Sequence, residues 1–109
     1  MDWVEQLNAA MDYIESHLRE AVRYEDAARI AGCSACHFQR MFTYLAGIPL
    51  SEYIRRRRMS LAAEDLSQGE KILDVALRYG YSSPTAFNRA FQAFHGLPPS
   101  RARAGGESL

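Results

Sequence analysis

A motif that occurs twice constrains the fold of this chain more than any other feature. The pattern Phe-x-Arg-x-Phe-x4-Gly-x-Pro starts at Phe38 and starts again 49 residues later, at Phe87. Upstream the repeat continues with a slip of one residue, because Ala28, Gly32 and Ser34 correspond to Ala76, Gly80 and Ser82. Matches with fixed gaps indicate that one supersecondary unit is used twice.

The first copy predicts a helix-turn-helix. Residues 24–31 show a short helical pattern that ends at Gly32, since glycine accepts the left-handed backbone found after a helix C-terminus. Ser34 can cap a following helix over residues 35–46. Two helices joined by a short turn that contains Gly are typical of a helix-turn-helix, whose second helix enters the DNA major groove.

Further helices are predicted on either side of this unit. Apolar residues from Trp3 to Leu18 follow the three-and-four spacing of an amphipathic helix, which Asp2 can cap. Residues 50–67 contain no Gly or Pro, and they follow Pro49, which fits the first position of a helix. This long helix would connect the first unit to the second.

The second copy repeats the design of the first. A helix over residues 72–79 ends at Gly80, and Ser83 with Pro84 starts the next helix. The sequence therefore predicts an all-α fold with two homeodomain-like helix-turn-helix subdomains in tandem. The expected domains are a DNA-binding domain at 1–104, made of a first unit (1–49), a connecting helix (50–67) and a second unit (68–104), and a flexible tail or linker at 105–109.

In the second helix of each unit, steps of three and four separate an apolar face from a polar face. The inward residues are Phe38, Met41, Phe42 and Leu45 in the first unit, and Phe87, Ala90, Phe91 and Phe94 in the second. The outward residues are Cys36, Gln39, Arg40 and Thr43, and Thr85, Asn88, Arg89 and Gln92. Gln39 and Arg40 are thus able to read base edges or to hold phosphates.

The charges of the chain cancel, but they are unevenly distributed. A net charge of zero argues against a nucleic-acid partner, because domains that bind nucleic acid usually carry a net positive charge. Residues 1–32, however, carry three basic and seven acidic side chains, whereas residues 33–60 carry five basic and one acidic. Such a chain can present one basic face. The run from Arg55 to Arg58 also fits ordinary solvated charges, so it does not decide the question alone.

Cys33 to His37 match Cys-x-x-Cys-His, the attachment pattern of c-type haem, and the two cysteines also fit a redox dithiol. Haem attachment needs an export route, and the acidic amino terminus does not resemble a signal peptide. A thioredoxin-like dithiol needs a βαβ surround, and zinc needs about four ligands. The simpler interpretation is a small turn residue, Cys33, and an ordinary helix residue, Cys36. We therefore expect no cofactor and no metal.

Length, composition and the absence of certain motifs narrow the possible classes of protein. A chain of 109 residues fits one domain of ordinary size. No run approaches the ~18 apolar residues of a membrane span, so we expect a cytoplasmic protein without a membrane partner. No nucleophile motif or Gly-rich phosphate loop indicates an enzyme. Glu64 and Asp65 are interpreted as a surface pair on a helix.

Taken together, these residues resemble the DNA-binding domain of the AraC/XylS transcription regulators. The similar stretches are Ala28 to Ser34, Phe38 to Phe42 and Gly47 to Met59 in the first half, and Val75 to Pro84 with the second Phe-x-Arg-x-Phe motif in the second half. The resemblance covers roughly residues 3–103. It implies about seven helices, with the third and sixth in adjacent major-groove segments of double-stranded DNA and the fourth between them.

The resemblance also implies roles for single residues. Cys36, Gln39 and Arg40 would face bases in the first unit, and Thr85, Asn88 and Arg89 in the second. Ser34, Thr43, Arg55, Ser83 and Gln92 are the expected phosphate contacts. Related stand-alone regulators often have a Trp at the place of Cys36, so the DNA target should differ. The aromatic often found before the terminal Arg is also missing between Pro98 and Arg103, which weakens the expectation of a seventh helix.

The layout of the chain resembles the Rob-like subgroup, in which the DNA-binding domain comes first. That resemblance implies a C-terminal effector-binding domain, absent from this chain, and RNA polymerase as a further partner. An alternative function is a helical protein-interaction module that keeps the helix-turn-helix shape and uses its basic face on an acidic protein. The net charge of zero favours this alternative, which reads no DNA.

Overall fold

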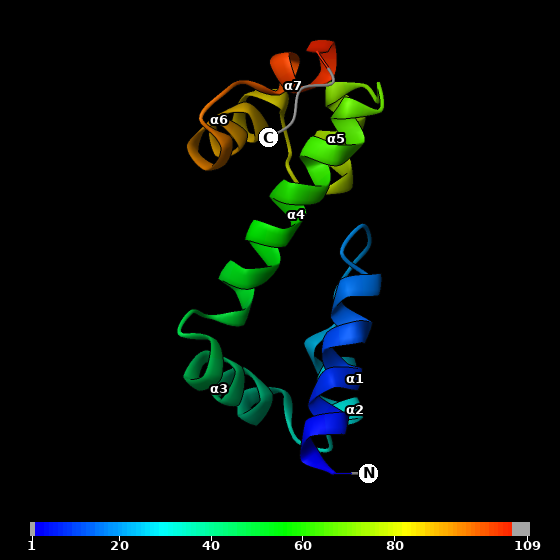
Figure 1. Cartoon of the computed structure of the whole chain (residues 1–109), viewed down its shortest axis with the longest axis vertical. Coiled ribbons are helices and arrows are strands. Elements are labelled where there is room, and N and C mark those ends of the chain that lie inside the picture. Colours follow the sequence, from blue (N-terminus) through cyan, green and yellow to red (C-terminus); the bar gives the residue numbers. More distant parts are fainter. Residues whose placement is uncertain (1, 106–109) are drawn as a thin grey trace. The chain divides into compact units, whose positions relative to one another are not determined.

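The computed structural model of the chain describes residues 2–105, the last two of them by their backbone alone. Within this range the chain forms seven α-helices and no strand (Figure 1). The helices are α1 (Trp3–Ser16), α2 (Tyr24–Ala31), α3 (Ala35–Ala46), α4 (Leu50–Ser67), α5 (Ile72–Arg78), α6 (Pro84–His95) and α7 (Pro99–Gly105). The all-α prediction is confirmed. The tail expected at 105–109 begins inside α7, and residues 106–109 lie outside the described part.

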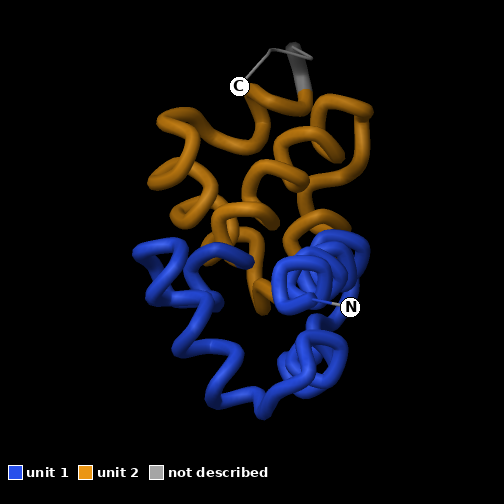
Figure 2. The backbone as a smooth tube through the Cα atoms, turned by 60° about the horizontal axis from the view of Figure 1, so that its bottom comes forward, with its two compact units in different colours: residues 1–54 blue, residues 55–109 orange. Residues whose placement is uncertain are grey.

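The chain divides into two compact units, residues 1–54 and residues 55–109 (Figure 2). The division falls inside α4, so this helix contributes its first turn to unit 1 and the rest to unit 2. Each unit has its own helix-turn-helix, formed by α2 and α3 in unit 1 and by α5 and α6 in unit 2.

Unit 1 begins with the amphipathic helix α1. The Asp2 carboxylate caps it by accepting a hydrogen bond from the backbone N–H of Glu5 at 2.9 Å. Ile14 and Leu18 are buried, although α1 ends before Leu18, at Ser16. Trp3, which the sequence placed on the same apolar stripe, is 60% exposed.

The turn between α2 and α3 follows the predicted chemistry. Gly32 has a φ of +80°, and the backbone N–H of Cys33 donates to the carbonyl of Ala28 at 3.0 Å, which closes the end of α2. The Ser34 hydroxyl then accepts a hydrogen bond from the backbone N–H of His37 at 3.1 Å. Both helices have the predicted bounds, and the turn therefore sets the direction in which α3 leaves.

Aromatic and polar contacts fix the start of α4 within unit 1. The rings of Phe42 and Tyr53 lie 5.3 Å apart, and the Tyr53 hydroxyl donates to the Glu15 carboxylate at 2.9 Å. Pro49 directly precedes α4, whose bounds agree with the predicted connecting helix at 50–67. Its carbonyl accepts the N–H groups of Glu52 and Tyr53, both at 3.1 Å, as the residue before a helix does.

Unit 2 repeats the turn with one extra residue. Gly80 has a φ of +88°, and the N–H of Tyr81 donates to the carbonyl of Ala76 at 3.0 Å. The Ser83 hydroxyl accepts from the N–H of Ala86 at 3.2 Å, and Pro84 is the first helical residue. The structural counterpart of the Ser34 cap is thus Ser83, and not Ser82 as the sequence match suggested.

Contacts with the core of unit 2 fix the position of α6 along its length. Phe87 and Phe91 are fully buried against Met59, Leu66, Val75 and Ala102. At the end of α6 the His95 ring lies 3.0 Å from the backbone carbonyl of Met59. The predicted inward positions are confirmed for the two phenylalanines in each of α3 and α6, since Phe38 and Phe42 are buried as well.

The prediction that Leu45 and Phe94 pack inward is wrong. Leu45 is 52% exposed and Phe94 is 38% exposed. Both lie in the last turn of their helices, just before Gly47 and Gly96 redirect the chain with φ values of +79° and +80°. Helical periodicity places them on the apolar side, but the core does not reach this last turn.

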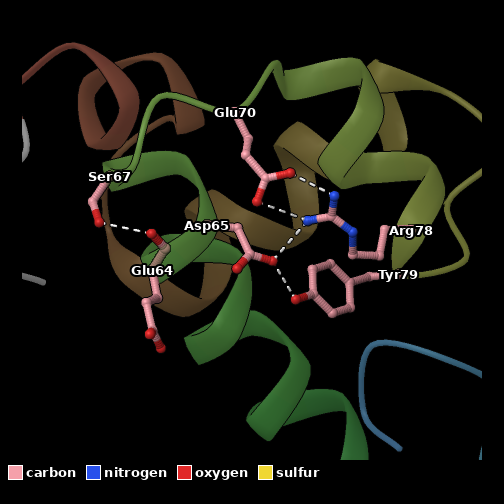
Figure 3. Close-up of polar contacts among 6 residues, drawn as sticks. All are labelled: Glu64, Asp65, Ser67, Glu70, Arg78 and Tyr79. Atoms are coloured by element: carbon pink, nitrogen blue, oxygen red, sulfur yellow. Dashed lines mark hydrogen bonds and ion pairs between the residues drawn. The ribbon is translucent and has the colours of Figure 1, made fainter.

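The interpretation of Glu64 and Asp65 as a surface pair is also wrong for Asp65, which is buried and 4% exposed. Its carboxylate accepts hydrogen bonds from the Tyr79 hydroxyl at 2.5 Å and from Arg78 at 3.0 Å (Figure 3). Arg78 also donates twice to Glu70, at 3.1 Å and 2.5 Å. These bonds supply the partners that a buried carboxylate requires, and they tie α5 to α4.

Candidate nucleic-acid interface

The exposed side of α3 carries the first set of predicted contact residues. Cys36, Arg40 and Thr43 are exposed, and Gln39 is half-buried. Spacings of three and four place all of them on one side of the helix. The opposite side carries the buried Phe38 and Phe42, so the packing of unit 1 fixes which side of α3 faces outward.

Contacts along α3 hold these side chains close to the helix. The Arg40 guanidinium donates to the sulfur of Cys36 at 3.3 Å, and the Gln39 amide donates to the carbonyl of Ala35 at 3.4 Å. The Thr43 hydroxyl donates to the carbonyl of Gln39 at 2.9 Å. Arg40 keeps further N–H donors, since a guanidinium has five. The only donor of the Thr43 hydroxyl is committed, so Thr43 must rotate before it can donate to a phosphate.

The exposed side of α6 carries the second set. Thr85, Asn88, Arg89 and Gln92 are all exposed. The Gln92 amide donates to the side-chain oxygen of Asn88 at 2.6 Å. This bond leaves the amide donors of Asn88 and one N–H of Gln92 for other partners. Arg89 occupies the position in α6 that Arg40 occupies in α3.

The two capping serines lie at the start of each exposed surface. The Ser34 and Ser83 hydroxyls accept a hydrogen bond from their own helix, and neither donor is used in that bond. Each hydroxyl hydrogen is therefore able to point toward an oxygen outside the protein. The first amides of each helix also leave partial positive charge at the same end, which favours an anion.

Arg55 lies on α4 within unit 2, close to the turn that precedes α6. Burial raises the pKa of the Tyr81 phenol, and the positive charges of Arg55 and Arg58 oppose that rise. Arg55 itself is exposed. Its positive charge thus acts on Tyr81, in the turn of the second helix-turn-helix.

The two cysteines that the sequence singled out do not form part of a metal site in the described residues. Cys33 and Cys36 are both free thiols, half-buried and exposed respectively. Across residues 2–103 no group of three or more His, Cys, Asp or Glu side chains is arranged to hold a metal ion. No helix of the described chain has the length and apolar content to cross a membrane.

Sequence reasoning passed over one prominent side chain. Tyr44 is 87% exposed and follows Thr43 on α3. It lies one helical turn beyond Arg40, so the spacing of four could have identified it. Its counterpart in unit 2 is Ala93, and the two exposed surfaces therefore differ most at this position.

Comparisons with known proteins agree on the kind of domain. A helix-turn-helix domain family matches residues 27–105. The transcriptional activator AarP of Providencia stuartii is 38% identical over 89 residues, which are 81% of this chain and 66% of AarP. The chain thus spans slightly less than two thirds of the length of that relative.

Two solved structures share the fold over most of the chain. The first is a transcriptional regulator with an AraC-type DNA-binding domain from Chromobacterium violaceum, with a TM-score of 0.81 and 25% identity, covering 95% of this chain and 94% of that one. The second is the DNA-binding domain of the global transcriptional factor AdpA in complex with a target DNA. Its TM-score is 0.73 at 28% identity, with coverage of 90% and 89%.

Proposed function

Because the chain belongs to the AraC-type family of helix-turn-helix transcription regulators, we propose that it binds a specific double-stranded DNA sequence through α3 and α6, each in the major groove. The members of this family are regulators and not enzymes. The observation that carries the proposal is the shared register of the two helices. In each, a buried pair of phenylalanines leaves one arginine, Arg40 or Arg89, exposed at the same position.

The base-facing roles follow from side-chain chemistry. Arg40 and Arg89 match the O6 and N7 acceptors of guanine, and Gln39 and Asn88 match adenine, because these pairs form two hydrogen bonds at once. Thr85 offers a methyl group to the methyl of thymine. Cys36 is small, and its sulfur accepts a hydrogen bond from Arg40. This bond sets the position of the Arg40 guanidinium before DNA is bound.

The phosphate roles are assigned to Ser34, Thr43, Arg55, Ser83 and Gln92. Ser34 and Ser83 use the hydroxyl hydrogens that capping leaves over, next to helix N-termini that favour anions. Arg55 adds charge beside the second turn. Such contacts position the protein on DNA without reading its sequence. Their loss should therefore weaken binding to all sequences alike and reduce its salt dependence.

The wider biology is proposed from the family alone. We infer a cytoplasmic regulator with RNA polymerase as a further partner and, as in the Rob-like layout, with an effector-binding domain that follows the DNA-binding domain. The DNA-binding step is tested on the chain of 109 residues itself.

Selection from a random pool of duplex DNA tests the proposal, followed by titration of the selected site. We expect an enriched sequence with two short conserved blocks. Arg40→Ala and Arg89→Ala should each cost about 1–3 kcal/mol on that site and relax the preference at one block. Arg29→Ala, at an exposed arginine of α2 that pairs with Asp26, is the matched control and should bind as the parent does.

Two results would contradict the proposal. If both variants bound every sequence as tightly as the parent, α3 and α6 would not be the docking elements. If no duplex, selected or random, were bound even at low salt, the chain would instead be an interaction module without DNA readout.

A further inference from the structure

An apolar groove lies between α1 and α3 within unit 1. It has a volume of about 220 Å³ and is lined by Leu7, Asn8, Met11, Phe42, Leu45 and Ala46. For comparison, an engineered apolar cavity of about 150 Å³ accommodates a benzene molecule. Val4, on the next turn of α1, is 47% exposed and extends the apolar surface. The groove is therefore large enough to receive a bulky apolar side chain.

This groove is distinct from the surface proposed to read DNA. Leu45 is five residues after Arg40, which at about 100° per residue places it roughly 140° around α3. Phe42 lies farther round still, and it is buried. An occupant of the groove would thus leave the side of α3 that carries Arg40 open.

The charges beside the groove select the kind of occupant. Helix α1 contains Glu5, Asp12 and Glu15 and no Lys or Arg. Glu5 and Asp12 are exposed, and Glu15 accepts the hydrogen bond from Tyr53. Complementary charge favours a basic partner, because like charges across an interface are costly. Nucleic acid and acidic proteins are disfavoured on this side of unit 1.

A second copy of the chain also fits this surface poorly. A two-fold interface brings the same patch of both copies together, and here it would place the acidic α1 against its own equivalent. A helix with spaced apolar anchors is the partner that suits a groove between two helices. It can bury Leu45, and its polar side can carry the positive charges that face Glu5 and Asp12.

We propose that the groove between α1 and α3 binds a basic amphipathic helix of a partner protein, with apolar side chains against Leu7, Met11 and Leu45 and with Lys or Arg along α1. This interaction is separate from DNA binding and does not depend on it. It gives a role to Leu45, an apolar side chain of a predicted core stripe that remains at the surface and lines the groove.

Binding of designed peptides to the whole chain tests this proposal. The first probe is a fluorescein-labelled peptide of about 18 residues, roughly five helical turns, with leucines at spacings of three and four and lysines elsewhere. The second probe carries glutamates in place of the lysines, and the third has the composition of the first in a shuffled order. Fluorescence anisotropy measures affinity, and two-dimensional NMR locates the contact.

We expect the basic amphipathic peptide to bind at least about tenfold more tightly than either control, a difference of roughly 1.4 kcal/mol. Leu45→Lys and Asp12→Lys should each weaken it severalfold. Leu73→Lys is the matched control, because Leu73 on α5 is 50% exposed, like Leu45, and lies in unit 2. All three positions are exposed, so the variants should fold, which circular dichroism verifies.

Three results would overturn the proposal. The first is equal binding of the acidic or the shuffled peptide, which would indicate an unspecific apolar surface or a site for small apolar ligands. The second is equal weakening by Leu73→Lys, or amide shifts outside α1 and α3. The third is self-association of the chain that Leu45→Lys abolishes, since the groove would then belong to a second copy.

Discussion

The two helix-turn-helix units share a register but differ in how polar groups hold them. In unit 1, Asp26 lies near the surface, where it accepts from the Tyr13 hydroxyl at 3.4 Å and pairs with Arg29 at 3.1 Å. In unit 2, Asp65 is buried and bonds to Tyr79 and Arg78. The same kind of residue thus has two different energetic roles.

The difference shows where charge contributes to this fold. Exposed ion pairs are screened by water and contribute little, so the pairs of Asp26 add little to the stability of unit 1. A buried carboxylate with hydrogen-bonded partners is costly to disrupt, because its partners lose bonds in a place that water does not reach. Unit 2 should therefore respond to polar substitutions that unit 1 tolerates.

The largest expected effects are equal in the two units. Phe38→Ala and Phe87→Ala each remove a fully buried ring and should each cost about 3–5 kcal/mol of unfolding free energy. Chemical denaturation followed by circular dichroism measures both, and the fluorescence of the single Trp3 reports on unit 1. Leu45→Ala and Phe94→Ala, at exposed positions, should cost far less. Unequal losses for the two phenylalanines would mean that the cores are not equivalent.

The second-largest effect should differ between the two units. Asp65→Ala leaves the Tyr79 hydroxyl without its buried acceptor and should cost about 3 kcal/mol. Asp26→Ala removes only partly exposed pairs and should cost less than about 1 kcal/mol. The same denaturation experiment compares them. Comparable losses would show that burial does not distinguish these two carboxylates.

Substitution of the two capping serines should have equal effects on stability in the two units. Ser34→Ala and Ser83→Ala each remove one side-chain bond to a helix amide, and each should cost about 1 kcal/mol. Ser34→Gly and Ser83→Gly should cost only a few tenths. Thermal unfolding of the four variants tests this pattern. A loss confined to one serine would show that the two turns differ in stability.

The smallest effect concerns Tyr81, in the turn of unit 2. Burial raises the pKa of Tyr81 above its unfolded value of about 10. The protonated phenol is therefore favoured by folding, and its contribution is complete below about pH 10 and is lost as the pH rises through the folded pKa. Tyr81→Phe should lose less stability than the parent in alkaline solution. Parallel pH profiles of the two proteins would contradict the shift.

Sequence reasoning succeeded where one local signal decides the structure. Gly32, Ser34, Ser83 and Pro84 fix the ends of helices through their own backbone or side-chain chemistry, and they lie as predicted. The four buried phenylalanines followed from periodicity. The repeat itself misaligned one cap, because it matched Ser34 to Ser82 by residue type, whereas the hydrogen bond is made by Ser83.

The errors concern features that depend on distant parts of the chain. Periodicity places Leu45 and Phe94 on the apolar side of their helices, but it does not show how far the core extends. The burial of Asp65 depends on Arg78 and Tyr79, which are 13 and 14 residues away. The proposed DNA contacts could be selected by face from the sequence. The pairing of Arg40 with Cys36 and of Gln92 with Asn88 required the structure.

The shared register of the two segments, Ser34 to Gly47 and Ser83 to Gly96, has a consequence for how such a chain can evolve. Cap, two core rings and terminal glycine recur at identical offsets. A recombination event that replaced one segment by the other would keep every one of these anchors and exchange the whole outward surface in a single step. The size difference between Met41 and Ala90 is the main mismatch that later point mutations would have to repair.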